Sequence, residues 1–136
     1  MASKNPNEKG GEYERNISGR LSLWVSNFTR DDLFWRSAMS GGRATLKGRK
    51  KSAIKSSAEV GDISLRHKMG APFLEIFTVE CKHWDDLCLR QYLFGKKGHI
   101  ADIWTKPLEE ARAVRRQPMV CAKQSHAGEL CFTTKK

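Results

Sequence analysis

The pattern that most constrains this chain is a pair of short segments, Gly61–Ile63 and Val79–Lys82, on either side of a turn signal at Gly70–Pro72. Glycine and proline close together mark tight turns. We therefore expect an antiparallel hairpin whose turn lies midway between positions 62 and 80. Directly opposite residues on such a pair have Cβ atoms roughly 4.5–5.5 Å apart. The pattern thus predicts that Asp62 lies beside Glu80.

Two carboxylates with an ammonium group at one end of a sheet indicate a metal-dependent nuclease site. Lys82 shares a strand face with Glu80, because side chains two residues apart on a strand point the same way. Mg²⁺ takes oxygen ligands and is commonly held by one or two carboxylates. Asp62 and Glu80 meet that need, with the backbone carbonyl of Cys81 as a third oxygen. We expect Lys82 to orient the attacking water and stabilise developing negative charge. The alternative is an exposed Glu-x-Lys on an ordinary strand.

The composition is typical of one globular domain with a polyanionic partner. The chain has 136 residues, 39% of them hydrophobic, and a formal net charge of +10. This length has room for one core, which we place at residues 12–134, after a flexible tail at 1–11. No apolar run approaches the roughly 20 residues of a membrane span, and no signal-peptide pattern opens the chain. We therefore expect a cytoplasmic protein. The positive charge points to nucleic acid, although ribosomal and membrane-surface proteins share this property.

A basic segment at residues 43–58 precedes the first motif segment. Its charges do not fall on one face of a regular element, and its Gly and Ser content favours a mobile loop. Backbone N–H groups of Gly41 and Gly42 at its base could also meet a phosphate. A solvated surface loop is the alternative, and Lys123 is left open between DNA and solvent. The charged positions in the segment that we assign to DNA contact are Arg43, Lys47, Arg49, Lys50, Lys51 and Lys55.

The remaining periodicity predicts helices alternating with strands. Apolar residues spaced as on one helical face predict helices over residues 12–24 and 100–111, the second interrupted at Pro107. A shorter helix is expected around Leu89 and Leu93, with Asp85 and Asp86 in its first turn. Residues 34–39 fit either a helix or a strand, whereas residues 118–123 and 129–133 predict two strands around a turn. This order favours an α/β or α+β fold, with helices packed on a mixed sheet.

The four cysteines show no zinc-site spacing with each other or with the histidines. We expect reduced thiols that act as small hydrophobic residues. A zinc site is the alternative.

At the motif residues the sequence resembles the PD-(D/E)XK nuclease superfamily, particularly small phage nucleases and archaeal-type Holliday junction resolvases. Gly61-Asp62 matches the first motif, with Gly in place of Pro, and Glu80-Cys81-Lys82 matches (D/E)-x-K. Glu14 looks like the glutamate that such enzymes carry on the first helix, where it adds to the metal site. Residues 34–42 look like their first strand and the Ser-Gly turn after it, with Ser40 as the turn serine that we add to the DNA contacts. The resemblance runs from about residue 12 to residue 133.

The resemblance implies a restriction-endonuclease-like core, in which a central mixed β-sheet is flanked by helices. It also implies Mg²⁺-dependent hydrolysis of DNA phosphodiester bonds, with Mn²⁺ expected to substitute and no organic cofactor. Resolvases of this type act in DNA recombination as homodimers, which implies a homodimer here and a phage-encoded protein in the host cytoplasm. The competing hypothesis is a non-catalytic, basic nucleic-acid-binding protein.

Overall fold

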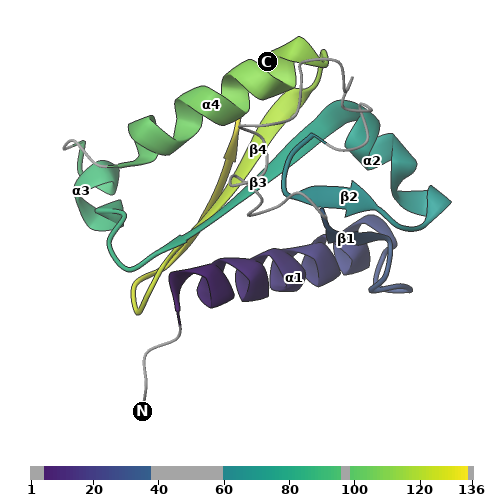
Figure 1. The fold of residues 1–136 in the computed structure, drawn as a ribbon, viewed down its shortest axis with the longest axis horizontal. Helices are drawn as coiled ribbons and strands as arrows, with labels where there is room; N and C mark the ends of the chain where they lie inside the picture. The colour runs from purple at the N-terminus through teal and green to yellow at the C-terminus, as the bar shows by residue number, and fades with distance from the viewer. Residues whose placement is uncertain (1–4, 38–59, 96–98, 135–136) are drawn as a thin grey trace, which may run out of the picture.

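The computed structural model describes residues 5–37, 60–95 and 99–134 (Figure 1). In chain order the elements are α1 (Pro6–Val25), β1 (Phe34–Arg36), β2 (Ile63–Leu65), a 3₁₀ turn η2 (Lys68–Gly70), α2 (Ala71–Ile76), β3 (Phe77–Trp84), α3 (Leu89–Leu93), α4 (Ile100–Ala113), β4 (Gln117–Gln124) and β5 (Gly128–Thr133). The basic segment at residues 43–58, with Ser40, Gly41 and Gly42 before it, lies outside the described residues.

The strands of the described part form two small sheets. β1 pairs with β2 antiparallel, while β3, β4 and β5 form a sheet in that order. β3 and β4 are parallel, and β4 and β5 are antiparallel. Parallel neighbours need a long crossover, which α3 and α4 provide. α4 lies on one face of the three-stranded sheet and α1 on the other (Figure 1). The fold is therefore mixed α/β, with a mixed sheet between helices, and the expected restriction-endonuclease-like core is confirmed.

α1 starts earlier than its apolar periodicity predicted. Asn5 caps the helix, since its side chain accepts a hydrogen bond from the backbone N–H of Asn7, and Glu8 completes a capping box. Pro6 occupies the first turn, where its missing N–H costs nothing. Residues 6–11, which we had placed in the tail, are thus helical, and the predicted helix start at residue 12 was wrong.

The predicted hairpin between residues 61 and 82 does not exist. β2 pairs with β1 instead, and residues 68–76 form η2 and α2, so β3 begins only at Phe77. The turn signal at Gly70–Pro72 is equally suited to a helix start, because the fixed φ of proline is compatible with the first helical turn. Phe73 and Leu74 are both buried from α2. The strand alternative for residues 34–39 is confirmed over β1.

The later elements follow the prediction closely. β4 and β5 cover the expected strands, and α3 occupies the expected short helix. Asp85 and Asp86 precede α3 rather than forming its first turn. α4 is a single helix that runs through Pro107, so the interruption predicted there was wrong.

Two apolar clusters pack on opposite sides of the three-stranded sheet. One joins α1 to the sheet through buried residues such as Tyr13, Ile17 and Val79. The other joins α4 to the sheet through residues such as Ile103 and Val120. Alternating strand side chains supply both clusters, as expected for a sheet covered on two faces.

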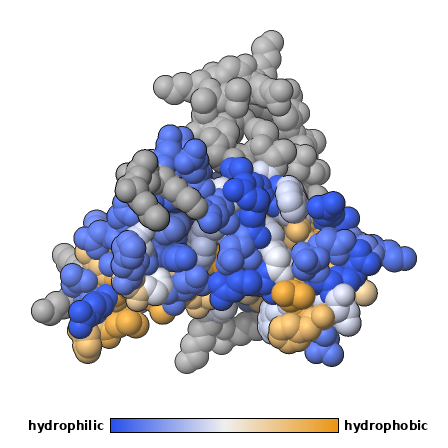
Figure 2. Space-filling model, turned by 90° about the horizontal axis from the view of Figure 1, so that it is seen from below, coloured by the Kyte–Doolittle hydropathy of each residue, from blue (hydrophilic) through white to orange (hydrophobic). Residues whose placement is uncertain are grey.

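The surface is mostly polar. Figure 2 shows a largely hydrophilic face with apolar patches near its margins. Large apolar side chains such as Trp24, Phe28 and Phe94 are exposed. Among the helices of the described ranges, none combines the length and apolarity needed to cross a membrane.

Candidate active site

The backbone of Asp62 joins the two sheets. Its N–H donates to the carbonyl of Val79 in β3, and its carbonyl accepts from the N–H of Ser37, which follows β1, both at 2.8 Å. The carboxylate is then held against the edge of β3, because the N–H of Cys81 donates to Asp62 Oδ2 at 2.8 Å. Asp62 therefore lies beside the Glu80 region of β3, as the spacing predicted, although the predicted hairpin is absent.

Gly61 makes this close approach possible. Its φ is +94°, in the region that residues with a side chain rarely adopt. A Cβ atom at this position would lie 2.7 Å from the carbonyl oxygen of Val79. The glycine that replaces the motif's proline thus lets the chain pass directly against β3.

Glu80 and Lys82 share one face of β3, as the strand alternation predicted. Lys82 Nζ donates to Glu80 Oε1 at 2.6 Å, and both side chains are partly buried. β3 is the edge strand of its sheet. The ion pair therefore borders the contact between the two sheets, here called the seam, which Asp62 bridges.

Glu14 reaches the same region from α1 and is only 8% exposed. Its Oε2 accepts a hydrogen bond from Nε of Arg36 in β1, at 2.6 Å. Gly11, one turn before Glu14, leaves room for that guanidinium group, since a Cβ atom there would lie 3.0 Å from Arg36 Nη1. Arg36 was not predicted as a site residue. The available signal was the strand alternation, which puts Arg36 on the same side as the buried Phe34.

Glu80 and Glu14 lie close enough to Asp62 to perturb its carboxyl group. The pKa of Asp62 is raised from 3.8 to about 7, mainly by burial and next by the negative charge of Glu80. Glu14 adds to the rise, while the hydrogen bond from the Cys81 N–H and the charge of Lys82 oppose it. Asp62, Glu80 and Glu14 therefore form one electrostatically coupled acidic cluster, and perturbed carboxyl groups of this kind are typical of functional sites.

The donor set fits a hard divalent cation, which prefers carboxylate and carbonyl oxygens. The raised pKa of Asp62 reflects first its burial and then the neighbouring negative charge, and such a cation would offset both. Beside Asp62, the hydroxyl of Ser37 is buried without a hydrogen-bond partner among the described residues. In the present arrangement Lys82 and Arg36 neutralise Glu80 and Glu14. Across the described ranges, no three Asp, Glu, His or Cys side chains converge tightly enough to hold a metal as they stand.

Lys123 lies apart from this cluster. It belongs to β4, with its Nζ 3.9 Å from Glu129 and 5.9 Å from the centre of the Tyr13 ring. The contact of Lys123 with DNA stays a prediction.

The fold and the acidic cluster define the class: a restriction-endonuclease-like α/β protein with the motif residues gathered at a sheet edge. Residues 5–135 match the family model described as "Phage putative PDDEXK endonuclease". The chain belongs to this family, a phage branch of the PD-(D/E)XK nucleases, and the resemblance drawn from its motifs is confirmed. The family supports a nuclease in general. Neither the curated proteins nor the solved structures gave a match.

Proposed function

We propose that the protein is a Mg²⁺-dependent DNA endonuclease whose active site is the cluster of Asp62, Glu80, Glu14 and Lys82. The observation that carries the proposal is the position of the Asp62 carboxylate on β3, hydrogen-bonded to the Cys81 N–H and electrostatically coupled to Glu80. A protein that only binds DNA gains nothing from carboxylates beside phosphates.

The ion would be held by Asp62, Glu80, Glu14 and the carbonyl of Cys81. The N–H and C=O of one strand residue point to the same side, so this carbonyl faces the strand edge where Asp62 lies. When bound, Mg²⁺ supplies positive charge to the phosphate and acidifies a water molecule. The same role is open to Mn²⁺.

The chain's own groups have separable tasks. The Cys81 N–H orients the Asp62 carboxylate, and Arg36 holds Glu14 in place across the gap between β1 and α1. Lys82, beside Glu80, orients the attacking water and stabilises negative charge on the phosphate oxygens as it develops.

The charge of the basic segment and its place in the sequence support DNA as the substrate. Residues 38–59 connect Ser37 to Val60, and the N–H of Ser37 is hydrogen-bonded to the carbonyl of Asp62. The described residue that precedes the segment, Ser37, therefore lies at the proposed active site. The cations of the segment, from Arg43 to Lys55, contribute much of the net charge of +10 that a polyanion would neutralise. A preference for branched DNA, a homodimer and a location in the host cytoplasm remain predictions from the resemblance.

The test uses a labelled four-way junction and a duplex of matched sequence, each with Mg²⁺, Mn²⁺ or EDTA. We expect cutting with either metal, none with EDTA, and none by Asp62→Ala. Asp31→Ala is the matched control, because Asp31 is an exposed aspartate outside the cluster. Preference for the junction would favour a resolvase. DNA binding without cutting, equal in wild type and Asp62→Ala, would refute the nuclease and leave the non-catalytic DNA-binding protein.

A further inference from the structure

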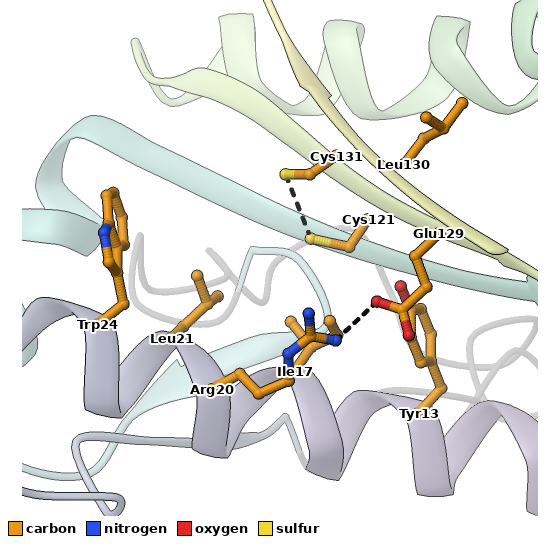
Figure 3. A pocket seen from close by; sticks show the side chains of 9 residues that line it. All are labelled: Tyr13, Ile17, Arg20, Leu21, Trp24, Cys121, Glu129, Leu130 and Cys131. Atoms are coloured by element: carbon orange, nitrogen blue, oxygen red, sulfur yellow. Dashed lines mark hydrogen bonds and ion pairs between the residues drawn. The ribbon is translucent and has the colours of Figure 1, made fainter. Parts of the chain in front are cut away.

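The sheet face that α1 covers carries two cysteines in direct register. Cys121 of β4 and Cys131 of β5 are Cα partners in the antiparallel ladder. Their sulfur atoms face each other 3.6 Å apart, with Cys121 Sγ–H donating to Cys131 Sγ (Figure 3). The proposed nuclease chemistry uses neither thiol. We propose that this pair is a modification site, at which a peroxide converts the two thiols into a disulfide across β4 and β5.

The backbone geometry is compatible with that bond. Directly opposite residues on antiparallel strands have Cα atoms about 4.5–5.5 Å apart, whereas disulfides span Cα separations of about 4.4–6.8 Å. The sulfur atoms must approach from 3.6 Å to roughly 2.05 Å. Rotation of the two side chains about their Cα–Cβ bonds supplies such a movement, so the hairpin can stay paired.

The pair is also accessible. Cys131 is exposed, whereas Cys121 is only 4% exposed. Both line a cavity of about 400 Å³ between α1 and the β4–β5 hairpin. Figure 3 shows this cavity with Trp24 and Leu21 on the helix side and the two sulfur atoms on the strand side. A small oxidant such as hydrogen peroxide can therefore reach Cys131 first.

The surroundings distinguish the two thiols. The hydrogen bond from Cys121 Sγ–H lowers the pKa of Cys131, and the positive charge of Arg20 lowers it further, against the effect of burial. Arg20 is itself held in the cavity by Glu129, with 2.6 Å between Nη1 and Oε2. The pKa of Cys121 is raised by the same hydrogen bond and by burial. Cys131 is thus the thiolate that attacks, and Cys121 the thiol that resolves the product.

The reaction proceeds in two balanced steps. The Cys131 thiolate attacks one peroxide oxygen, the O–O bond breaks, and the departing hydroxide takes up a proton to become water. The resulting sulfenic acid is then attacked by Cys121 sulfur. The S–S bond forms as the S–O bond breaks, and the hydroxyl group leaves as water with the thiol proton of Cys121. In total, two thiols and one peroxide give one disulfide and two waters, with two electrons passing from sulfur to peroxide.

The other cysteines provide the comparison. Cys81 is the Cα partner of Cys121 on the opposite side, in the parallel strand β3, and it is buried. Cys88 precedes α3 and is partly exposed. Among the described residues, the close contact between two sulfur atoms is that of Cys121 and Cys131.

The 136-residue protein, fully reduced and then treated with hydrogen peroxide, tests the proposal without any nuclease assay. After free thiols are blocked, trypsin separates all four cysteines, because a Lys or Arg lies between each consecutive pair. Cys121 falls in peptide 117–123 and Cys131 in peptide 124–135. We expect mass spectrometry to find these two peptides linked, with the loss of two hydrogen atoms, and to find them separate again after reduction.

Three variants make the test specific. Cys121→Ser and Cys131→Ser should each abolish the link, whereas Cys88→Ser should form it as wild type does. Circular dichroism of each variant shows that the fold is retained. Three results would overturn the proposal. They are a link between peptides 69–82 and 117–123, a disulfide between two chains, and oxidation of Cys131 to sulfinic acid while Cys121 stays free.

Discussion

Replacing Asp62 with asparagine should stabilise the metal-free protein while abolishing its proposed activity. The introduced amide would keep an oxygen that accepts the Cys81 N–H, as Asp62 Oδ2 does at 2.8 Å. The substitution removes a negative charge that is buried beside Glu80. The free energy of unfolding should therefore rise, because the buried charge is gone while the hydrogen bond is kept.

The size and the sign of the effect follow from the pKa of Asp62, which rises from 3.8 when unperturbed to about 7 in the fold. Between these values the folded state binds more protons than the unfolded state, so the free energy of unfolding falls as pH rises. At about 1.36 kcal/mol per pKa unit, the full cost above the folded pKa is at most about 4 kcal/mol. Since part of this cost is already present near pH 5, wild type should lose about 2–3 kcal/mol at most between pH 5 and pH 8.

Urea denaturation in EDTA at a series of pH values measures this directly. Asp62→Asn should exceed wild type in stability, by a margin that grows from pH 5 to pH 8. Asp31→Asn, an exposed control of the same chemistry, should follow the wild-type curve. Adding Mg²⁺ should then stabilise wild type and leave Asp62→Asn unchanged. Equal or lower stability of Asp62→Asn at pH 8 would refute the reasoning about the crowded carboxylates.

Other substitutions probe the site separately. Lys82→Met should lower the cutting rate by about 10²–10³-fold, with DNA affinity retained in a gel-shift assay. Gly61→Ala should cost about 1–3 kcal/mol in urea denaturation, because φ is +94° and a Cβ atom would meet the Val79 carbonyl. Arg36→Met should cost about 1–3 kcal/mol by leaving the buried Glu14 carboxylate without that partner, and Arg36→Lys should recover part of it. Neutralising residues 49–51 should weaken DNA binding and reduce the slope of log affinity against log salt by about one for each phosphate that is no longer neutralised.

Each of these expectations has a contrary outcome. Wild-type cutting by Lys82→Met would remove that ammonium group from the chemistry. A Gly61→Ala protein as stable as wild type would mean that the chain can move away from β3 at no cost. Unchanged stability of Arg36→Met would show that Glu14 finds charge compensation elsewhere. An unchanged salt slope would place the basic segment away from the phosphates.

The sequence could locate the acidic pair without giving the right topology. The three side chains meet wherever residue 62 contacts the edge of β3. The strand alternation then puts Glu80 and Lys82 on the same face of β3. Pairing of β2 with β1 was out of reach, because Gly70–Pro72 suits a turn and a helix start alike. The choice between them depends on the burial of Phe73 and Leu74, which is a tertiary property.

Other misses have different causes. Asn5 and Glu8 have the spacing of a capping box and indicated the N-terminus of α1. The apolar periodicity begins only at Tyr13, so the predicted helix started too late. The ion pair of Arg36 with Glu14 joins residues from two elements. One sequence does not reveal which of its many arginines meets a given glutamate, so this contact required the fold.

The seam between the two sheets has an evolutionary consequence. Among the described residues, two of the three hydrogen bonds that close it involve the main chain of residue 62, and the third involves its carboxylate. The backbone path and Gly61 therefore largely determine how the sheets join, whereas the proposed cleavage depends on the side chain of Asp62. A descendant could exchange the aspartate, keep the same architecture and become more stable. Under the proposed function, a single substitution at this position would separate a nuclease from a protein that only binds DNA.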